Sequence, residues 1–172
     1  MYFDLVILDV SRFDASTTAD QVLHGMDLSD KVAVVTGAGS VGGIGFEVAR
    51  SLARHGAHVV IGARDVVRGG AAAAEIRKAQ RGPIRRVDVL HLDLTSFDSV
   101  AAFADGFTAL FDGSVVKLDI LVLCAGVMGL PYTQTSDGFE TMFQVLTNSN
   151  IKTKLRSEQI LDVCRNTHTF DF

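Results

Sequence analysis

Short apolar runs alternate with stretches of helical periodicity through the middle of the chain. Four runs rich in Val, Ile and Leu are each followed by small or polar residues, as in strands buried on both faces of a parallel sheet. These runs cover residues 31–36, 58–61, 86–92 and 118–124. Apolar positions with helical spacing separate them, over 44–55, 70–81 and 95–111. The alternation predicts an α/β fold built on a parallel, doubly wound sheet with right-handed crossovers.

The two ends of the chain are less regular than its middle. A polar lead-in covers residues 1–30 and contains one predicted short helix at 17–25. Toward the C-terminus, weaker patterns predict helices over 136–145 and 151–163. We therefore divide the chain into a lead-in (1–30), a central domain (31–145) and a C-terminal tail (146–172).

Small and polar residues collect where the predicted strands end. The carboxyl ends of parallel strands meet at one edge of a sheet, where ligands bind in this class of fold. The four strand ends therefore predict one shared ligand site. The residues at these ends are Thr36 and Gly37, Arg64, Asp93, and Cys124, Ala125 and Gly126.

A glycine-rich stretch follows the first predicted strand. Residues 35–45, VTGAGSVGGIG, fit G-x-G-x-x-G over 37–42, and they also fit T-G-x-x-x-G-x-G if two residues are inserted. Glycines let the backbone approach a phosphate, and the free N–H groups and dipole of the following helix attract anions. The alternative is a tight strand-to-helix turn that binds no ligand.

Composition and charge narrow the range of functions. The 172 residues suffice for one domain with a sizeable core, and a net charge of −4 argues against a general nucleic-acid binder. Two cysteines, Cys124 and Cys164, do not make a disulfide framework and suit a reducing compartment. The N-terminal run lacks a basic region, and no run approaches about 18 apolar residues, so we expect a cytoplasmic protein without a membrane span. The five histidines show no metal-ligand spacing, so no metal site is predicted.

Seven stretches follow one another in a specific order along the chain. They are RFDASTT (12–18), KVAVVTG (31–37), GIGFEVAR (43–50), HGAHVVI (55–61), LDLT (92–95), LCAG (123–126) and DGFETMFQV (137–145). This ordered set resembles the short-chain dehydrogenase/reductase superfamily, especially the oxidoreductase domain of WW domain-containing oxidoreductases and the retinol-dehydrogenase-like enzymes. The resemblance implies a Rossmann-type NAD(P)-binding domain over 31–145, truncated to about four strands in the order 3-2-1-4, with a divergent tail.

The resemblance also implies which residues hold the cofactor. The first glycine turn and the start of the following helix hold the dinucleotide pyrophosphate. A basic residue after the second strand pairs with the 2′-phosphate of NADP, and Arg64 takes that place, with Arg68 one turn further on. An acidic residue there favours NAD, but Asp65 stands one position late, so NADP is expected rather than NAD. The predicted cofactor-binding residues are Gly37, Ser40, Gly43, Ile44, Gly45, Arg64, Asp93, Leu94, Cys124, Ala125 and Gly126.

The family spacing decides between the two glycine patterns. From Gly43 to the second strand the chain matches the family without a gap, so the match over 37–42 is coincidental and Val41-Gly42 bulges from the phosphate loop. Asp93 corresponds to the family aspartate near the adenine, a role compatible with capping the next helix. Cys124 stands where the family usually has asparagine, and we interpret it as a small buried residue rather than a nucleophile.

The family's catalytic Tyr-x-x-x-Lys pair is missing from the 172 residues. The two tyrosines, Tyr2 and Tyr132, are followed four positions later by Val6 and Ser136. By resemblance, a complete relative oxidises or reduces an alcohol or carbonyl of a small lipophilic substrate with NADP. We expect this chain to hold no catalytic residue and to transfer no hydride. The alternatives are a truncated or splice-variant module that binds the dinucleotide, or a protein partner at the exposed edge strand 118–124, and an unstable fragment.

Overall fold

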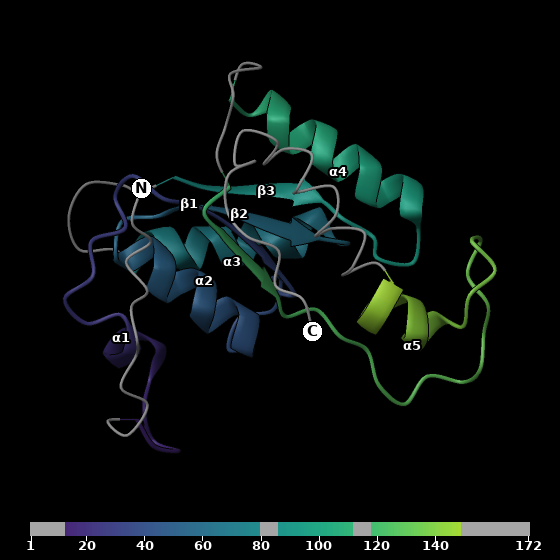
Figure 1. Ribbon diagram of the computed structural model, residues 1–172, viewed down its shortest axis with the longest axis horizontal. Helices are drawn as coiled ribbons and strands as arrows, with labels where there is room; N and C mark the ends of the chain where they lie inside the picture. The colour runs from purple at the N-terminus through teal and green to yellow at the C-terminus, as the bar shows by residue number, and fades with distance from the viewer. Residues whose placement is uncertain (1–12, 80–85, 112–117, 149–172) are drawn as a thin grey trace, which may run out of the picture.

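The computed structural model describes residues 13–79, 86–111 and 118–148, and a four-stranded parallel sheet lies at its centre (Figure 1). The strands lie in the order β3-β2-β1-β4. They are β1 (Val32–Thr36), β2 (His58–Ala63), β3 (Val87–His91) and β4 (Ile120–Leu123). The predicted α/β class, parallel strands and 3-2-1-4 order are confirmed.

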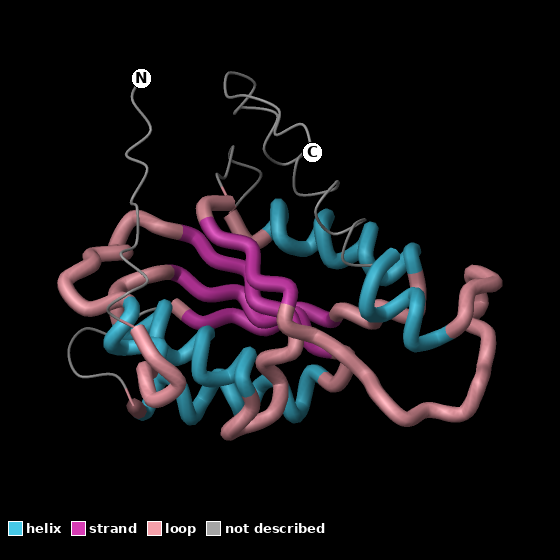
Figure 2. The backbone as a smooth tube through the Cα atoms, turned by 60° about the horizontal axis from the view of Figure 1, so that its bottom comes forward, coloured by secondary structure: helices cyan, strands magenta, loops and turns pink. Residues whose placement is uncertain are grey.

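Helices cover both faces of the sheet (Figure 2). They are α2 (Ile44–Arg54), α3 (Val66–Lys78) and α4 (Phe97–Ala109). Helices α2 and α3 pack on one face, where Val35 and Ile61 are fully buried. Helix α4 packs on the other face, against Val34 and Val60. Successive strand residues point to opposite faces, so a sheet covered on both sides requires unbroken apolar runs. The central strands β1 and β2 carry such runs, VAVV and VVIGA, whereas the edge strand β3, VDVLH, is interrupted by Asp88.

Side-chain caps set where two of these helices begin. Helix α3 begins four residues before the predicted Gly70, because the Asp65 carboxylate accepts hydrogen bonds from two backbone N–H groups of the first turn, both at 3.0 Å. In α4 the N-cap is Ser96, one residue after the predicted Thr95, and its hydroxyl accepts a hydrogen bond from the backbone N–H of Ser99. The predicted apolar stripe of α4 is buried against the sheet. Helices α3 and α4 end at Lys78 and Ala109, earlier than the predicted residues 81 and 111.

A short helix, α1 (Ala19–Val22), fastens the N-terminal segment to α2. The carboxylate of Asp20 accepts hydrogen bonds from the Ser51 hydroxyl at 2.7 Å and from Arg50 and Arg54 at 3.1 and 2.7 Å. Burial opposes the charge of Asp20, but the hydrogen bonds from Ser51 and Arg50 and the charges of both arginines outweigh it and lower the pKa. The predicted helix at 17–25 is therefore present, in a shorter form, and is held by these polar contacts.

The segment after β4 differs from the helix predicted over 136–145. Gly138 has a φ of +81°, in the left-handed region that a right-handed helix does not contain. The chain turns there, so α5 (Thr141–Phe143) begins only afterwards, and the π-helix η2 (Gln144–Asn148) follows it. The helix predicted over 151–163 lies outside the described residues.

Candidate functional site

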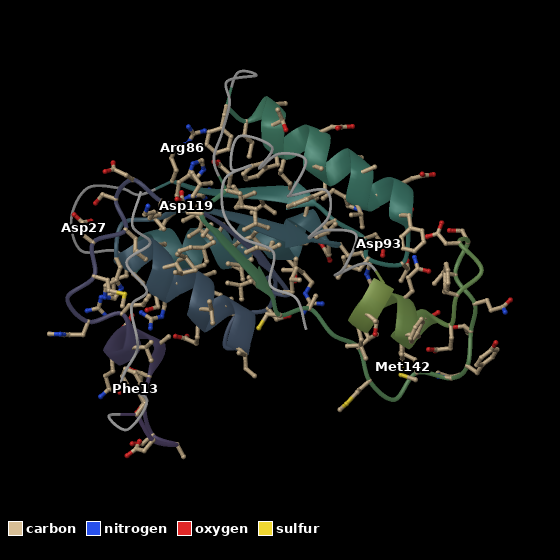
Figure 3. The ribbon with its side chains drawn as sticks, in the orientation of Figure 1. Phe13, Asp27, Arg86, Asp93, Asp119 and Met142 are labelled. Carbon is tan, nitrogen blue, oxygen red and sulfur yellow. The ribbon has the colours of Figure 1, made fainter. Side chains whose placement is uncertain are left out.

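A cleft of about 300 Å³ opens at the carboxyl ends of all four strands. Each strand end contributes a wall residue: Thr36, Ala63, Leu92 and Cys124. Figure 3 shows Asp93, another wall residue, at this end of the sheet, whereas Arg86 and Asp119 lie at the opposite end. The structure therefore brings together the strand ends that the sequence singles out.

Two glycines, Gly37 in the glycine loop (residues 35–45) and Gly45 at its end, allow three elements to pack closely. Gly37 has a φ of +73°, and a Cβ added there would lie 2.7 Å from the backbone oxygen of Cys124 and the backbone nitrogen of Ala125. A Cβ added at Gly45 would lie 2.7 Å from the carbonyl oxygen of Gly37. Because neither position has room for a side chain, the end of β1 can touch both the segment after β4 and the first turn of α2.

Helix α2 begins beside the cleft without a side-chain cap. Its N-cap is Gly43, which has no side chain to accept a hydrogen bond from the first turn. The first N–H groups of a helix have no intrahelical acceptors, and they carry the positive end of the helix dipole. Of the predicted residues here, Gly43, Ile44 and Gly45 adjoin the cleft but do not line it, and the Ile44 side chain is 80% exposed. This helix start offers unpaired backbone donors to an anion.

The two extra residues of the glycine loop form the centre of a β-turn. The backbone N–H of Gly43 donates to the carbonyl oxygen of Ser40 at 3.0 Å, closing a turn over 40–43. Gly42 has a φ of +80°, the conformation that position three of a type II turn requires. Val41, at position two, is exposed. The turn thus places Val41 at the surface, and α2 begins at Ile44, after the last residue of the turn.

Three charged residues lie where the chain leaves β2 and enters α3. Arg64 lines the cleft and makes no hydrogen bond or ion pair with any described residue. Asp65 caps α3 through its Oδ1 atom. The Arg68 guanidinium donates to the Ser40 hydroxyl at 2.8 Å, which links α3 to the glycine loop. The cleft therefore carries two guanidinium groups and one carboxylate on this side.

Asp93 shapes the turn between β3 and α4. Its Oδ1 atom accepts hydrogen bonds from the backbone N–H and the hydroxyl of Thr95, at 2.9 and 2.7 Å. Its own backbone N–H donates to the Ser99 hydroxyl at 2.8 Å. Asp93 therefore has a structural role in the turn as well as a place in the cleft wall, while the buried Leu94 beside it belongs to the core packed under α4.

Thr36 joins the ends of β1 and β4. Its hydroxyl accepts hydrogen bonds from the backbone N–H groups of Cys124 and Ala125, both at 3.1 Å. The Thr36 side chain is fully buried, and Cys124 is a half-buried free cysteine. The segment Cys124-Ala125-Gly126 is therefore held in the cleft wall by the strand beside it.

A buried glutamine places the last wall residue, Val145. The Gln144 amide donates to Asp137 Oδ2 at 2.7 Å and accepts a hydrogen bond from the Thr135 hydroxyl. The same Asp137 oxygen accepts from the backbone N–H of Phe97, the first residue of α4, at 2.8 Å. This network ties the segment after β4 to α4, and so brings Val145 to the cleft.

Eight of the eleven predicted cofactor-binding residues line the cleft, and three stand in the adjoining first turn of α2. The eight are Gly37, Ser40, Arg64, Asp93, Leu94, Cys124, Ala125 and Gly126. Further wall residues were not in the predicted set: Thr36, Gly39, Gly62, Ala63, Asp65, Arg68, Leu92, Thr95, Val127 and Val145. Most of them lie within a few positions of a predicted residue, so a predicted set widened by a few residues at each strand end would have included them. No local signal marks Val145.

The part of the chain that the structure describes contains neither a candidate metal-ion cluster nor a candidate membrane-spanning helix. No group of three or more His, Cys, Asp or Glu side chains gathers there in a way that could hold a metal ion. Within the same residues, no helix combines the length and apolar character needed to cross a membrane.

Comparisons with known proteins agree with this geometry. A family model described as short chain dehydrogenase matches residues 31–158. The WW domain-containing oxidoreductase of Danio rerio is 48% identical over 134 residues, which cover 78% of this chain and 31% of that protein. Retinol dehydrogenase 12 of Mus musculus is 48% identical over 120 residues, covering 70% of this chain and 35% of that protein. The chain thus spans about a third of the length of these relatives.

A solved structure extends the likeness to three dimensions. A metagenomic short-chain oxidoreductase in complex with NADP superposes on this chain with a TM-score of 0.66 and 31% sequence identity. The match covers 82% of this chain and 61% of that one.

Proposed function

The chain belongs to the short-chain dehydrogenase family, and from that membership we propose that its cleft binds NADP(H). The observation that carries the proposal is the uncapped start of α2 beside a cleft lined by all four strand ends. Unpaired backbone donors next to a glycine loop fit the pyrophosphate of a dinucleotide. For a protein that spans the whole length of the relatives, we propose hydride exchange with the alcohol or carbonyl of a small lipophilic substrate.

The charges beside β2 support NADP over NAD. Arg64 is unpaired among the described residues, and a guanidinium matches the geometry of a phosphate group. Asp65 directs one carboxylate oxygen to the backbone of α3, which is a capping role. The similar metagenomic oxidoreductase was solved in complex with NADP.

The remaining wall residues suit the other parts of the ligand. The turn shaped by Asp93 would contact the adenine, and Cys124-Ala125-Gly126 would border the nicotinamide-ribose half. Leu94, Val127 and Val145 give the cleft an apolar side, and one relative is named a retinol dehydrogenase. Both points support a lipophilic substrate. When bound, the nicotinamide supplies or accepts the hydride, while these residues hold and orient the cofactor.

This 172-residue chain by itself is proposed to bind the cofactor without transferring hydride. Neither Tyr2 nor Tyr132 has a lysine four positions later, so the chain lacks the family's acid–base pair. Loss of a positioned acid–base group costs about 10²–10⁴-fold in rate. Any remaining hydride transfer would then proceed without an acid–base group, with only the binding of cofactor and substrate in the cleft to assist it.

Calorimetry with NADPH tests the binding proposal on the 172-residue chain. We expect heat release together with thermal stabilisation of the protein by the ligand. The absence of both at millimolar NADPH would refute the proposed function. Oxidation of a panel of alcohols with NADP⁺ tests the second part, because a rate above that of Asp93→Ala would refute catalytic incompetence.

A second candidate function is protein binding at the edge of the sheet. Within the described residues β4 pairs with β1 alone, and its four residues are only half-buried. An unpaired strand edge can accept a strand from another chain. Slower amide exchange in β4 when a partner is present would support this candidate, whereas unchanged exchange would count against it.

A further inference from the structure

One oxygen atom of Asp137 joins two parts of the cleft wall. Its Oδ2 atom accepts a hydrogen bond from the backbone N–H of Phe97 at 2.8 Å and another from the Gln144 side-chain amide at 2.7 Å. Phe97 begins α4, two positions after the wall residue Thr95. Gln144 begins η2 and directly precedes the wall residue Val145. The place of Asp137 therefore sets how far the turn before α4 lies from the start of η2.

The Gln144 side-chain amide is held through both its nitrogen and its oxygen. Gln144 is fully buried, its amide nitrogen donates to Asp137, and its amide oxygen accepts a hydrogen bond from the Thr135 hydroxyl. A buried amide without partners costs free energy, so the side chain keeps this one arrangement. Hydrogen bonds are directional, whereas apolar contact is not, so Thr135, Asp137 and Gln144 (the Asp137 network) fix a single position for the start of η2.

The segment that carries Val145 depends on tertiary contacts for its position. Helix α5 has three residues and η2 has five, and helices this short are not stable by themselves. Just before them, the Phe139 ring packs edge-on against the Phe97 ring, with the centroids 5.7 Å apart. Val145 is buried in the same apolar cluster as Leu94. Apolar packing thus brings the segment to α4, and the Asp137 network sets its exact place there.

The two wall parts that the network joins lie at the proposed adenine end of the ligand. Asp93 and Thr95 form the turn that is proposed to contact the adenine. Leu94, between them, belongs to the apolar cluster that includes Val145. Figure 3 shows Asp93 and Met142 of α5 at the same end of the molecule. A base is a flat group with apolar faces, so its binding depends on wall groups held at a fixed spacing.

We propose that Asp137 and Gln144 are positioning residues, which set the width of the cleft where the adenine of NADP(H) binds. The proposal rests on the proposed function, because it assigns part of the dinucleotide to the same cleft. Neither residue lines the cleft, so both act through Val145 and through the turn before α4. A ligand binds only the molecules in which both wall parts are in place, so its apparent affinity falls with that fraction.

Titration with NADPH and with adenosine 2′,5′-bisphosphate, which lacks the nicotinamide half, tests the proposal on the 172-residue chain. The Gln144→Met variant keeps a side chain of similar length but loses the hydrogen bonds to Asp137 and Thr135. It should bind both ligands about three- to tenfold more weakly and by the same factor, because both contain the adenine.

Variants of Asp137 test the shared oxygen directly. Asp137→Ala removes the acceptor of both hydrogen bonds and should weaken both ligands at least as much as Gln144→Met does. Asp137→Asn keeps one oxygen that can accept from Phe97 and Gln144, so it should retain most of the affinity that Asp137→Ala loses.

Ser51→Ala is the matched control, because it also removes the hydrogen bond of a fully buried side chain to a carboxylate. The Ser51 hydroxyl donates to Asp20 at 2.7 Å, and neither residue lines the cleft. Ser51→Ala should lower the midpoint of urea unfolding, as Gln144→Met does, and leave both ligand affinities unchanged.

The outcomes separate the positioning role from cofactor binding. The role is overturned, while cofactor binding stands, if Gln144→Met weakens NADPH alone, if it lowers stability without changing either affinity, or if Ser51→Ala weakens both ligands equally. It is overturned as well if the bisphosphate does not displace NADPH from the unmodified chain. If the unmodified chain does not bind NADPH, the proposed function itself fails.

Discussion

Helices α2 and α3 both begin beside the same cleft, but they treat their first turns differently. Helix α3 starts at Asp65, whose carboxylate accepts hydrogen bonds from two backbone N–H groups at 3.0 Å. Helix α2 starts at Gly43, which offers no side-chain acceptor. The other described helices resemble α3, because their caps Thr18, Ser96 and Glu140 all accept backbone hydrogen bonds.

The start of α3 is stabilised by a side-chain cap, whereas the start of α2 leaves backbone N–H groups available to a ligand. A side-chain cap adds about 1 kcal/mol to the stability of a helix, and a glycine cap gives up part of that gain. At α2 the missing cap coincides with a glycine loop and a cleft, so backbone donors stay free where an anion can bind. At α3 two backbone N–H groups already donate to Asp65, so an anion beside this helix would be bound by the arginine side chains.

The largest effect is expected from one methyl group in the first turn of α2. Gly45→Ala places a Cβ 2.7 Å from the Gly37 carbonyl oxygen, so the free energy of unfolding should fall by about 3 kcal/mol. Gly70→Ala is the matched control in α3, because an added Cβ there meets nothing within 4 Å. It should raise stability by about 0.5–1 kcal/mol. Urea unfolding measures both, and equal effects would contradict the close packing of α2 on the loop.

Adding a side-chain cap to α2 should stabilise its first turn, as in α3, and weaken NADPH binding. In Gly43→Asp the new carboxylate can accept the first-turn N–H groups, so stability should rise by a few tenths of a kcal/mol. NADPH binding should weaken about tenfold, because the donors are occupied and a negative charge faces the pyrophosphate. Gly43→Ala is the control, since it adds the same Cβ without an acceptor. Calorimetry would contradict the comparison if both variants bound NADPH equally well.

Removing the side-chain cap from α3 should lower the stability of the protein without weakening NADPH binding. Asp65→Ala should lower the free energy of unfolding by about 1 kcal/mol, because two backbone N–H groups lose their acceptor. NADPH should bind at least as well, since a negative charge near the phosphate is gone. Asp65→Asn keeps an oxygen at the cap and should recover most of the stability. A selective loss of NADH binding in Asp65→Ala would show that Asp65 is a ligand rather than only a cap.

The smallest effect concerns the opposite end of α2, where Asp20 binds Ser51 and two arginines. The pKa of Asp20 lies below the ordinary value of 3.8, so its contribution is complete above about pH 4 and fades as the pH falls through the lowered pKa. Asp20→Asn should lose about 0.5 kcal/mol at pH 7 and flatten the acid side of the stability curve. Thermal melts between pH 3 and pH 7 measure both, and an unchanged acid slope would contradict the assignment.

The central sheet was predictable because its signals are local. Each strand is a short run rich in Val, Ile and Leu followed by small or polar residues, although Asp88 interrupts β3, and α4 carries one apolar stripe. The site was predictable where it coincides with a strand end, as at Gly37, Arg64 and Cys124. The helix predicted over 136–145 begins only at Thr141, because the backbone at Gly138 is left-handed, which apolar spacing alone does not reveal. The domain boundaries at residues 30 and 145 stay predictions.

The sequence by itself determined the class of fold, the strand order expected for its family, and the position of the glycine loop, because periodicity and glycine placement act over a few residues. Only the tertiary structure decided which side chains meet across that loop. Arg68 reaches Ser40 over 28 positions, and Asp137 holds the start of α4 over 40 positions. These contacts depend on how glycines and turns bring separate elements together, and no short stretch of sequence contains that information.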